Sequence, residues 1–165
     1  MNRERLTAHD TTLSRRLALW ADGRFRHTLA WMLARSGDGA FWFLVIAILF
    51  WQKQRLGWDL LLTVVITAVL VGLLKGIFRR QRPKAKRAFA TDKYSFPSGH
   101  AARATAVAVT LAFHQPILAP LWLVWAILVA LARVALSRHF ISDIIGGVVV
   151  GLLTGVGCQL FMVFY

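Results

Sequence analysis

The chain is 165 residues long, 58% of its residues are hydrophobic, and its formal net charge at pH 7 is +13. A mean hydropathy of +0.59 is too high for an ordinary soluble domain or a disordered chain, so the composition predicts an integral membrane protein. The single cysteine excludes a disulfide framework, and the charge beside long apolar runs favours anionic lipid or a phosphate substrate over nucleic acid as the partner.

The first 36 residues combine many charges with apolar residues at helical spacing. Apolar positions recur from Leu13 to Leu33, and arginines fall between them. Gly23 is expected to separate two short helices. This pattern is typical of an amphipathic segment in the membrane interface, and it fits a polar helix packed on its own protein equally well. The role of residues 1–36 is therefore left open.

The rest of the chain contains five apolar segments, which predict an all-α membrane bundle of about five spanning helices. The segments run from about Gly39 to Trp51, from Trp58 to Phe78, from about Ser98 to Phe113, from Ile117 to Leu136 and from Phe140 to Tyr165. The first and third are shorter than the ~20 residues that a spanning helix needs, so we expect them to continue into flanking residues. Neither a linker nor a repeat interrupts the chain, which predicts one domain over residues 1–165 with its helical core at 39–165.

Five spans would place the loops alternately on two faces of the membrane. The N-terminal segment, the loop at 79–96 and the turn at 137–139 would share one face. Lys53 and Arg55 are the basic residues expected on the other face, which leaves 18 of the 20 Lys and Arg on or near the first. The positive-inside rule favours a cytoplasmic position for that first face. Its basic run from Arg79 to Lys93, Arg80 included, is interpreted as an anion-attracting surface.

A histidine and an aspartate near the start of the last apolar segment are the most informative residues. Asp143 is the only acid between Phe140 and Tyr165, and a lone carboxylate in an apolar segment is costly enough to indicate a function. His139 lies four residues earlier, a spacing that puts both side chains on one helix face. The carboxylate can then hold one imidazole nitrogen and leave the other to act as base or nucleophile. A structural ion pair is the alternative interpretation.

Three motifs that are far apart in the sequence are expected to meet on this face. They are Lys75-x6-Arg82-Pro83, Pro97-Ser98-Gly99-His100 and Arg133-x5-His139-x3-Asp143. Guanidinium groups match phosphate oxygens, and a helix that starts at a Ser98 cap would offer free backbone N–H groups, that of Gly99 included, to an anion. Since Asp143 is the only carboxylate near either histidine in sequence, no metal site is indicated. Cationic side chains would then have to stabilise a phosphoryl group without a metal.

In this order and spacing, the three motifs resemble those of the phosphatidic acid phosphatase type 2 family, the membrane branch of a superfamily that also includes vanadium-dependent haloperoxidases. Ala132 stands where that family usually has serine, which costs at most a hydrogen bond worth about 1 kcal/mol. The resemblance implies that His139 attacks phosphorus, that Asp143 orients His139, and that His100 protonates the leaving oxygen. It also implies which residues hold the phosphate oxygens: Lys75, Arg82, Ser98, Gly99 and Arg133.

Together the motifs predict a metal-independent lipid phosphatase that uses no cofactor and lies in a bacterial plasma membrane. The resemblance implies that the reaction passes through a phosphohistidine intermediate. The small size, similar to that of compact bacterial members, favours a polyprenyl phosphate or diphosphate over a glycerolipid phosphate such as phosphatidic acid. The alternatives are a vanadate-dependent haloperoxidase and a non-catalytic protein that binds or transports anionic lipid. Members of the family often place the site on the outer face, which opposes the cytoplasmic position that the basic residues favour. No nucleic-acid partner is expected, and the oligomeric state is not predicted.

Overall fold

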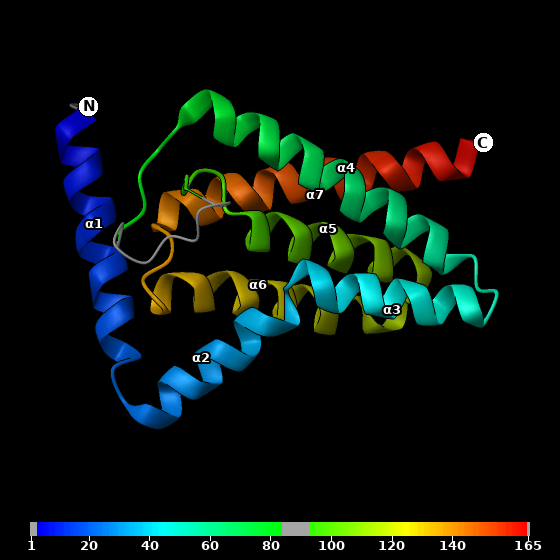
Figure 1. Ribbon diagram of the computed structural model, residues 1–165, viewed down its shortest axis with the longest axis horizontal. Helices are drawn as coiled ribbons and strands as arrows, with labels where there is room; N and C mark the ends of the chain where they lie inside the picture. The colour runs from blue at the N-terminus through cyan, green and yellow to red at the C-terminus, as the bar shows by residue number, and fades with distance from the viewer. Residues whose placement is uncertain (1–2, 84–92, 165) are drawn as a thin grey trace.

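The computed structural model describes residues 3–83 and 93–164, and the backbone of these ranges is almost entirely helical (Figure 1). The helices are α1 (Arg3–Trp20), α2 (Arg24–Ser36), α3 (Gly39–Trp51), α4 (Leu56–Phe78), α5 (Gly99–His114), α6 (Ala119–Ala135) and α7 (Ile141–Phe164), and a short 3-10 helix, η2 (Pro116–Leu118), precedes α6. The predicted all-α class is confirmed. Gly23 separates α1 from α2, as expected, and is the N-cap residue of α2.

The predicted count of about five membrane spans is not confirmed by the helices of residues 3–83 and 93–164. Three helical stretches are long and apolar enough to cross a membrane, namely α4, η2 with α6, and α7. The pair α2 and α3, bent by 48°, would make a fourth. Helix α5 has only 16 residues. It cannot lengthen, because Pro97 and the Ser98 cap fix its start and Pro116 follows its end. The membrane class is thus confirmed, whereas the count of about five spans is not.

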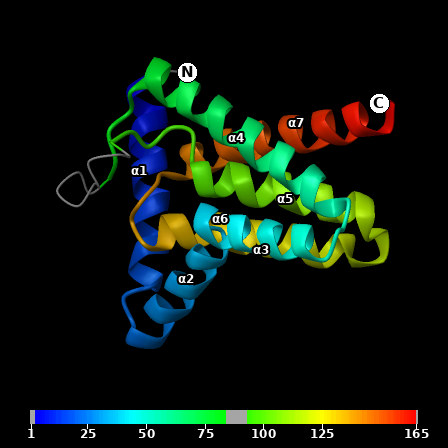
Figure 2. The ribbon, with the colours of Figure 1, turned by 45° about the vertical axis from the view of Figure 1, so that its right-hand side comes forward.

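Helix α5 lies at the centre of the bundle and packs against α4, α6 and α7 (Figures 1 and 2). The side chains that make this possible are its fully buried alanines: Ala101, Ala102, Ala104, Ala106 and Ala108. Small residues let neighbouring backbones approach closely, and such packing holds helices together where lipid provides no hydrophobic drive between them. The composition of α5 therefore explains its central position.

A stripe of glycines on α7 sets its distance from α5. Gly147, Gly151 and Gly155 recur every four residues and so lie on one face of the helix. A Cβ atom at Gly151 would lie 2.3 Å from the carbonyl oxygen of Ala102, and one at Gly147 would lie 2.6 Å from that of Ser98. No side chain fits at either position. The stripe therefore brings the first turn of α7, which carries the candidate site residues, against the first turn of α5.

Buried polar side chains link α4, α5 and α7. The hydroxyl oxygens of Thr63 and Thr110 are 3.1 Å apart, and those of Thr67 and Thr154 are 2.9 Å apart. The amide of Gln159 donates to the Thr110 hydroxyl at 3.4 Å. In an apolar environment such hydrogen bonds fix which helix faces meet, so α4, α5 and α7 are held in one register.

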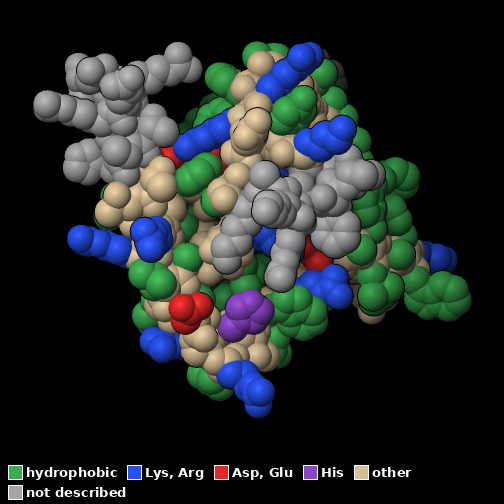
Figure 3. Space-filling view, turned by 60° about the vertical axis from the view of Figure 1, so that its left-hand side comes forward, with side chains coloured by type: hydrophobic (Ala, Val, Ile, Leu, Met, Phe, Trp, Pro, Cys, Tyr) green, Lys and Arg blue, Asp and Glu red, His purple; other side chains and the backbone are tan. Residues whose placement is uncertain are grey.

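Helix α1 lies across one end of the bundle rather than along it (Figures 1 and 2). The C-terminal ends of α4 and α6 and the N-terminal ends of α5 and α7 meet at this end, and the α3–α4 turn and the C-terminus lie at the other. Lys and Arg side chains are distributed over the end beside α1 (Figure 3). The segments that carry the three motifs therefore converge, as the alternation of segments predicted.

Candidate active site

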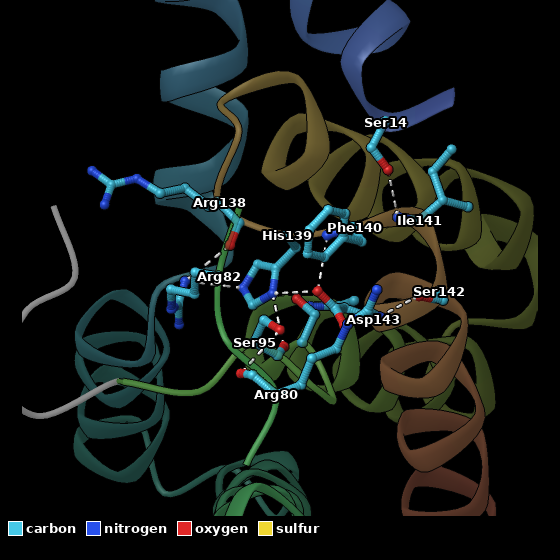
Figure 4. Close-up of polar contacts among 12 residues, drawn as sticks. Ser14, Arg80, Arg82, Ser95, Arg138, His139, Phe140, Ile141, Ser142 and Asp143 are labelled. Atoms are coloured by element: carbon cyan, nitrogen blue, oxygen red, sulfur yellow. Dashed lines mark hydrogen bonds and ion pairs between the residues drawn. The ribbon is translucent and has the colours of Figure 1, made fainter. Parts of the chain in front are cut away.

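His139 lies in the turn between α6 and α7 and is 1% exposed. Its Nδ1 is 2.9 Å from the carbonyl oxygen of Ser95 (Figure 4). A carbonyl oxygen only accepts hydrogen bonds, so Nδ1 carries the proton and Nε2 keeps its lone pair. The Nε2 atom faces Arg82, whose Nη1 is 3.5 Å away. The hydrogen bond to the Ser95 carbonyl therefore keeps the proton on Nδ1 and the lone pair on Nε2.

Ser95 is held in place by the first motif segment. Its backbone N–H donates to the carbonyl of Arg80 at 2.8 Å, and its hydroxyl donates to the carbonyl of Gln81 at 3.0 Å. An isolated bridge between Gln81 and Tyr94 strengthens the same pairing. The segment after α4 thus positions the carbonyl that orients His139. A backbone atom carries no sequence signature, so this contact was not predicted.

The environment of His139 keeps its imidazole neutral. Burial lowers the pKa of His139 to about 4, and the charges of Arg82 and Arg133 act in the same direction. Asp143 opposes them, because a nearby negative charge favours the imidazolium form. At neutral pH the Nε2 lone pair is consequently available.

We expect the imidazole of His139 to stay neutral as the pH is lowered from about 8 to about 5. The reason is that its pKa of about 4 lies below the ordinary histidine value, so protonation is delayed to lower pH. The ¹⁵N shifts of labelled histidines in detergent, assigned with a His139→Asn variant, report both the titration and the protonated nitrogen. A titration midpoint near that of free histidine, or a proton on Nε2, would contradict this assignment.

Asp143 is fully buried at the first turn of α7. Its Oδ2 accepts the backbone N–H of Phe140 at 2.8 Å, and its Oδ1 accepts Nη1 of Arg80 at 2.8 Å. The distance from Oδ2 to Nδ1 of His139 is 3.7 Å, which is too long for a hydrogen bond. Asp143 therefore acts on His139 as a nearby charge, and Nδ1 donates its hydrogen bond to the Ser95 carbonyl.

Arg80 does not belong to a solvent-facing basic surface, contrary to its interpretation from sequence. Both of its terminal nitrogens bond to carboxylates, and its side chain is only 28% exposed. Arg79 and Lys93 are exposed and agree with that interpretation. The other basic residues of the run, Lys84, Lys86 and Arg87, lie outside the described residues.

The second motif starts α5 at the site. The predicted cap is confirmed, because the hydroxyl of Ser98 accepts the backbone N–H of Ala101 at 3.4 Å. The backbone N–H of Ser98 donates to the carbonyl of Asp143 at 2.9 Å, which joins the first turns of α5 and α7. Gly99 is the first residue of the helix. The free N–H groups of this turn thus lie beside the residues of the third motif.

His100 pairs with a carboxylate that the sequence did not single out. Its Nε2 is 2.6 Å from Oδ1 of Asp38, a residue between α2 and α3. Arg35 contacts the other oxygen of Asp38 at 3.4 Å. Because a carboxylate accepts, Nε2 carries a proton in this pair, and Nδ1 is the nitrogen left to exchange a proton with a ligand. The only sequence signal for Asp38 is its position directly before the first apolar segment.

The three cations assigned to phosphate come from separate segments of the chain. Lys75 lies in the last turn of α4, Arg133 lies in the last turn of α6, and Arg82 lies in the extended stretch between α4 and α5. The charge of Arg133 acts on both His100 and His139, so it is within electrostatic reach of both imidazoles. The structure therefore brings the cations and the two histidines to the same end of the bundle.

Ala132, where the family usually has serine, is part of a small apolar cluster. It is 4% exposed and packs with Ala21, Ala30 and Ala34 of the N-terminal segment. This position thus joins α6 to α1 and α2. Its small apolar side chain contributes to packing, and the charged and imidazole positions of the third motif are retained.

These contacts gather cationic side chains around two imidazoles that have different hydrogen-bond partners. Nδ1 of His139 donates to the Ser95 carbonyl and leaves the Nε2 lone pair facing Arg82, whereas Nε2 of His100 is paired with the Asp38 carboxylate. Within the described residues, no group of three or more His, Cys, Asp and Glu side chains is placed to hold a metal ion. The guanidinium and ammonium groups are the charges that the chain itself offers to a tetrahedral anion.

Replacing Gly99 with alanine is expected to preserve the fold and to lower kcat/KM by about 10-fold, if the backbone N–H groups hold an anion. The nearest atom to an added Cβ is Cγ1 of Val71 at 3.5 Å, an ordinary contact. The fold can therefore accept the added methyl group, but the methyl group would prevent an anion from approaching the backbone N–H groups closely. Gly72→Ala, where an added Cβ meets nothing within 4 Å, is the matched control and should leave kcat/KM unchanged. Wild-type kcat/KM for Gly99→Ala would exclude close approach of the anion.

The fold and the site define a helical membrane protein with cationic side chains and two histidines gathered at one end of its bundle. Residues 56–164 match the PAP2 superfamily. The chain therefore belongs to this superfamily, as the three motifs predicted.

Among relatives, the chain is 34% identical over 113 residues to phosphatidylglycerophosphatase B of Bacillus subtilis (strain 168). This match covers 60% of the chain and 56% of that protein, so the chain spans little more than half the length of this relative.

Two solved structures share the fold. A crystal structure of a transmembrane PAP2-type phosphatidylglycerolphosphate phosphatase from Bacillus subtilis gives a TM-score of 0.81 at 27% identity, over 94% of this chain and 85% of that chain. The crystal structure of Aquifex aeolicus LpxE gives a TM-score of 0.78 at 25% identity, over 90% of this chain and 93% of that chain. The helical arrangement of the family thus extends over most of the chain.

Proposed function

We propose that the chain is a lipid phosphatase, a membrane hydrolase that removes phosphate from a lipid whose tail stays in the bilayer. The observation that carries the proposal is the placement of His139, whose Nδ1 lies 2.9 Å from the Ser95 carbonyl oxygen while Nε2 faces Arg82. A buried neutral imidazole with its lone pair directed at a guanidinium suits attack on a bound phosphoryl group. Membership of the PAP2 superfamily and the names of the Bacillus subtilis relatives support the same activity.

The first step forms a bond between Nε2 of His139 and phosphorus and breaks the bond between phosphorus and the lipid oxygen. The leaving oxygen takes the bonding electron pair and a proton from Nδ1 of His100. The Nε2–H of His100 stays on Asp38, which stabilises the imidazolium form before transfer. The products of this step are the lipid alcohol, or a lipid monophosphate from a diphosphate, and a phosphohistidine.

The second step releases phosphate. Water attacks phosphorus, the P–N bond breaks, and its electron pair returns to Nε2 of His139. His100, neutral after the first step, accepts the proton of the water at Nδ1 and is ready for the next cycle. Neither step requires a metal ion or another cofactor. The groups proposed to bind the phosphoryl oxygens throughout are Lys75, Arg82, Ser98, Gly99 and Arg133.

Phosphate release by the purified protein in detergent tests the proposal. The substrate panel contains a polyprenyl diphosphate, phosphatidylglycerophosphate and phosphatidic acid, each with EDTA present. We expect turnover of at least one lipid that EDTA does not abolish and that His139→Asn does abolish. No turnover of any lipid would contradict a phosphatase, and complete loss with EDTA would contradict a metal-free reaction.

The same panel decides the lipid. The small size of the chain led us to favour a polyprenyl substrate, whereas the names of the Bacillus subtilis relatives favour a glycerolipid phosphate. The lipid with the highest kcat/KM identifies the substrate class. Peroxidase activity that requires vanadate would instead support the haloperoxidase alternative, and lipid binding without turnover would support the non-catalytic one.

We further propose a bacterial plasma-membrane location with the site on the cytoplasmic side, because the N-terminal segment adds arginines to the site face. A Lys84→Cys variant tests this side, because Cys158, the only native cysteine, is buried. A membrane-impermeant maleimide should label the new cysteine only after permeabilisation of the cells. Labelling in intact cells would place the site on the outer face.

A further inference from the structure

Helix α1 supplies hydrogen-bond partners to the start of α7. The first backbone N–H groups of a helix have no partner within the helix. In α7, the N–H of Ile141 donates to the hydroxyl of Ser14 at 3.0 Å, and the N–H of Ser142 donates to Oδ1 of Asp10 at 3.1 Å. Asp10 and Ser14 are four residues apart and so lie on one face of α1. Side chains of α1 therefore cap the helix that carries Asp143.

Asp10 is also connected to Asp143 through a single guanidinium group. Arg80 donates from Nη2 to Oδ2 of Asp10 and from Nη1 to Oδ1 of Asp143, each at 2.8 Å. The hydroxyl of Ser142 bonds to both Asp10 and Arg80. The centroid of the Phe140 ring lies 4.4 Å from Cζ of Arg80, so the ring covers one face of the guanidinium. The orientation of Arg80 beside Asp143 (Figure 4) thus depends on its second anionic partner.

The Asp10 carboxylate is charged under ordinary conditions. Partial burial raises its pKa, but the hydrogen bonds from Ser142 and Arg80 outweigh burial and bring the pKa below the usual aspartate value. Its side chain is 13% exposed, so the ion pair with Arg80 is largely shielded from water.

We propose that Asp10 is a positioning residue for the phosphatase reaction and acts on the pair of Asp143 and His139 through Arg80. This inference rests on the proposed function. With Asp10 present, Arg80 is shared between two carboxylates, and Oδ2 of Asp143 stays directed toward His139. Without the Asp10 charge, Arg80 shifts toward Asp143 or toward the bound phosphate. Either shift disturbs the charge that faces Nδ1, which lowers kcat more than it changes KM.

The test compares Asp10→Asn with Asp22→Asn in the lipid-phosphate assay. Asparagine keeps the size of the side chain and an oxygen for the N–H of Ser142, but it removes the charge that holds Arg80. We expect kcat to fall by roughly 10-fold and KM to change by less than about 2-fold. Asp22 is exposed and follows α1, so Asp22→Asn removes the same charge from the same segment and should leave kcat unchanged.

A double-mutant cycle with Asp143→Asn separates positioning from a general structural role. If Asp10 acts through Asp143, then Asp10→Asn should cost less than about 2-fold in the Asp143→Asn background. An equal loss in both backgrounds, or a wild-type kcat for Asp10→Asn, would overturn the inference. Should Asp10→Asn fail to fold, Ser142→Ala, which removes only the hydroxyl between Asp10 and Arg80, is used in its place. It should lower kcat a few-fold, with the same dependence on Asp143, and the absence of any loss would overturn the inference.

Failure of this inference is distinguishable from failure of the proposed function. If the wild-type protein turns over no lipid phosphate, the proposed function itself is wrong. If the wild type is active and Asp10→Asn is equally active, the phosphatase stands and the role of Asp10 is wrong.

Discussion

Replacing His139 with asparagine is expected to lower kcat by about 10⁴-fold or more without unfolding the protein. Asparagine places an N–H donor near the position of Nδ1, so it can still bond to the Ser95 carbonyl, but it has no nucleophilic nitrogen in place of Nε2. Phosphate release and thermal unfolding in detergent, measured on the same preparation, check both parts of this expectation.

The control for this substitution is His27→Asn, since His27 is exposed on α2 and belongs to no motif. It should keep the wild-type kcat. A folded His139→Asn protein that retains more than about 1% of the wild-type kcat would remove His139 as the nucleophile.

Replacing His100 with alanine is expected to lower kcat with a lipid phosphate by about 10³-fold, because the strongly basic lipid oxygen then leaves without a proton. With p-nitrophenyl phosphate the leaving group is weakly basic and needs no acid. The variant should therefore release one equivalent of nitrophenolate in a burst and then stall, since His100 is also the base for the attacking water. Stopped-flow absorbance measures this burst directly.

Asp38→Asn is the companion variant, because it leaves His100 in place and removes the carboxylate 2.6 Å from its Nε2. It should show the same dependence on the leaving group with a smaller loss, of about 10-fold. If His100→Ala lost the burst and steady-state turnover equally with both substrates, His100 would act in binding rather than in proton transfer.

The convergence of the motifs could be predicted because it follows from local features and from the alternation of apolar segments. Pro97 and Ser98 start α5 by ordinary helix-capping chemistry, and Pro116 prevents its continuation. The alternation then places the end of α6, with Arg133, and the start of α7, with Asp143, at the same end of the bundle. The number of spans is not confirmed, since α5 has only 16 residues and is buried largely through alanines, so its length and composition do not identify it as a spanning helix.

The site residues that were not predicted from the sequence lie outside the three motifs. Asp10 and Asp38 lie in or next to a charged N-terminal segment, where one aspartate among many charges has no periodic pattern to distinguish it. The Ser95 carbonyl is a backbone atom and depends only on tertiary placement. The glycine stripe was available from the four-residue spacing of Gly147 and Gly151, which is typical of close helix packing in membranes.

The most direct test of the phosphohistidine reaction is to trap the phosphoenzyme. The His100→Ala protein is mixed with ³²P-labelled p-nitrophenyl phosphate, quenched in alkali within milliseconds to seconds, and digested for peptide mapping. We expect an acid-labile, alkali-stable label on the peptide that contains His139, with phosphorus on Nε2, and no label when His139 is also replaced by asparagine. A label on another residue or on Nδ1, or a nitrophenolate burst without any labelled protein, would contradict the mechanism.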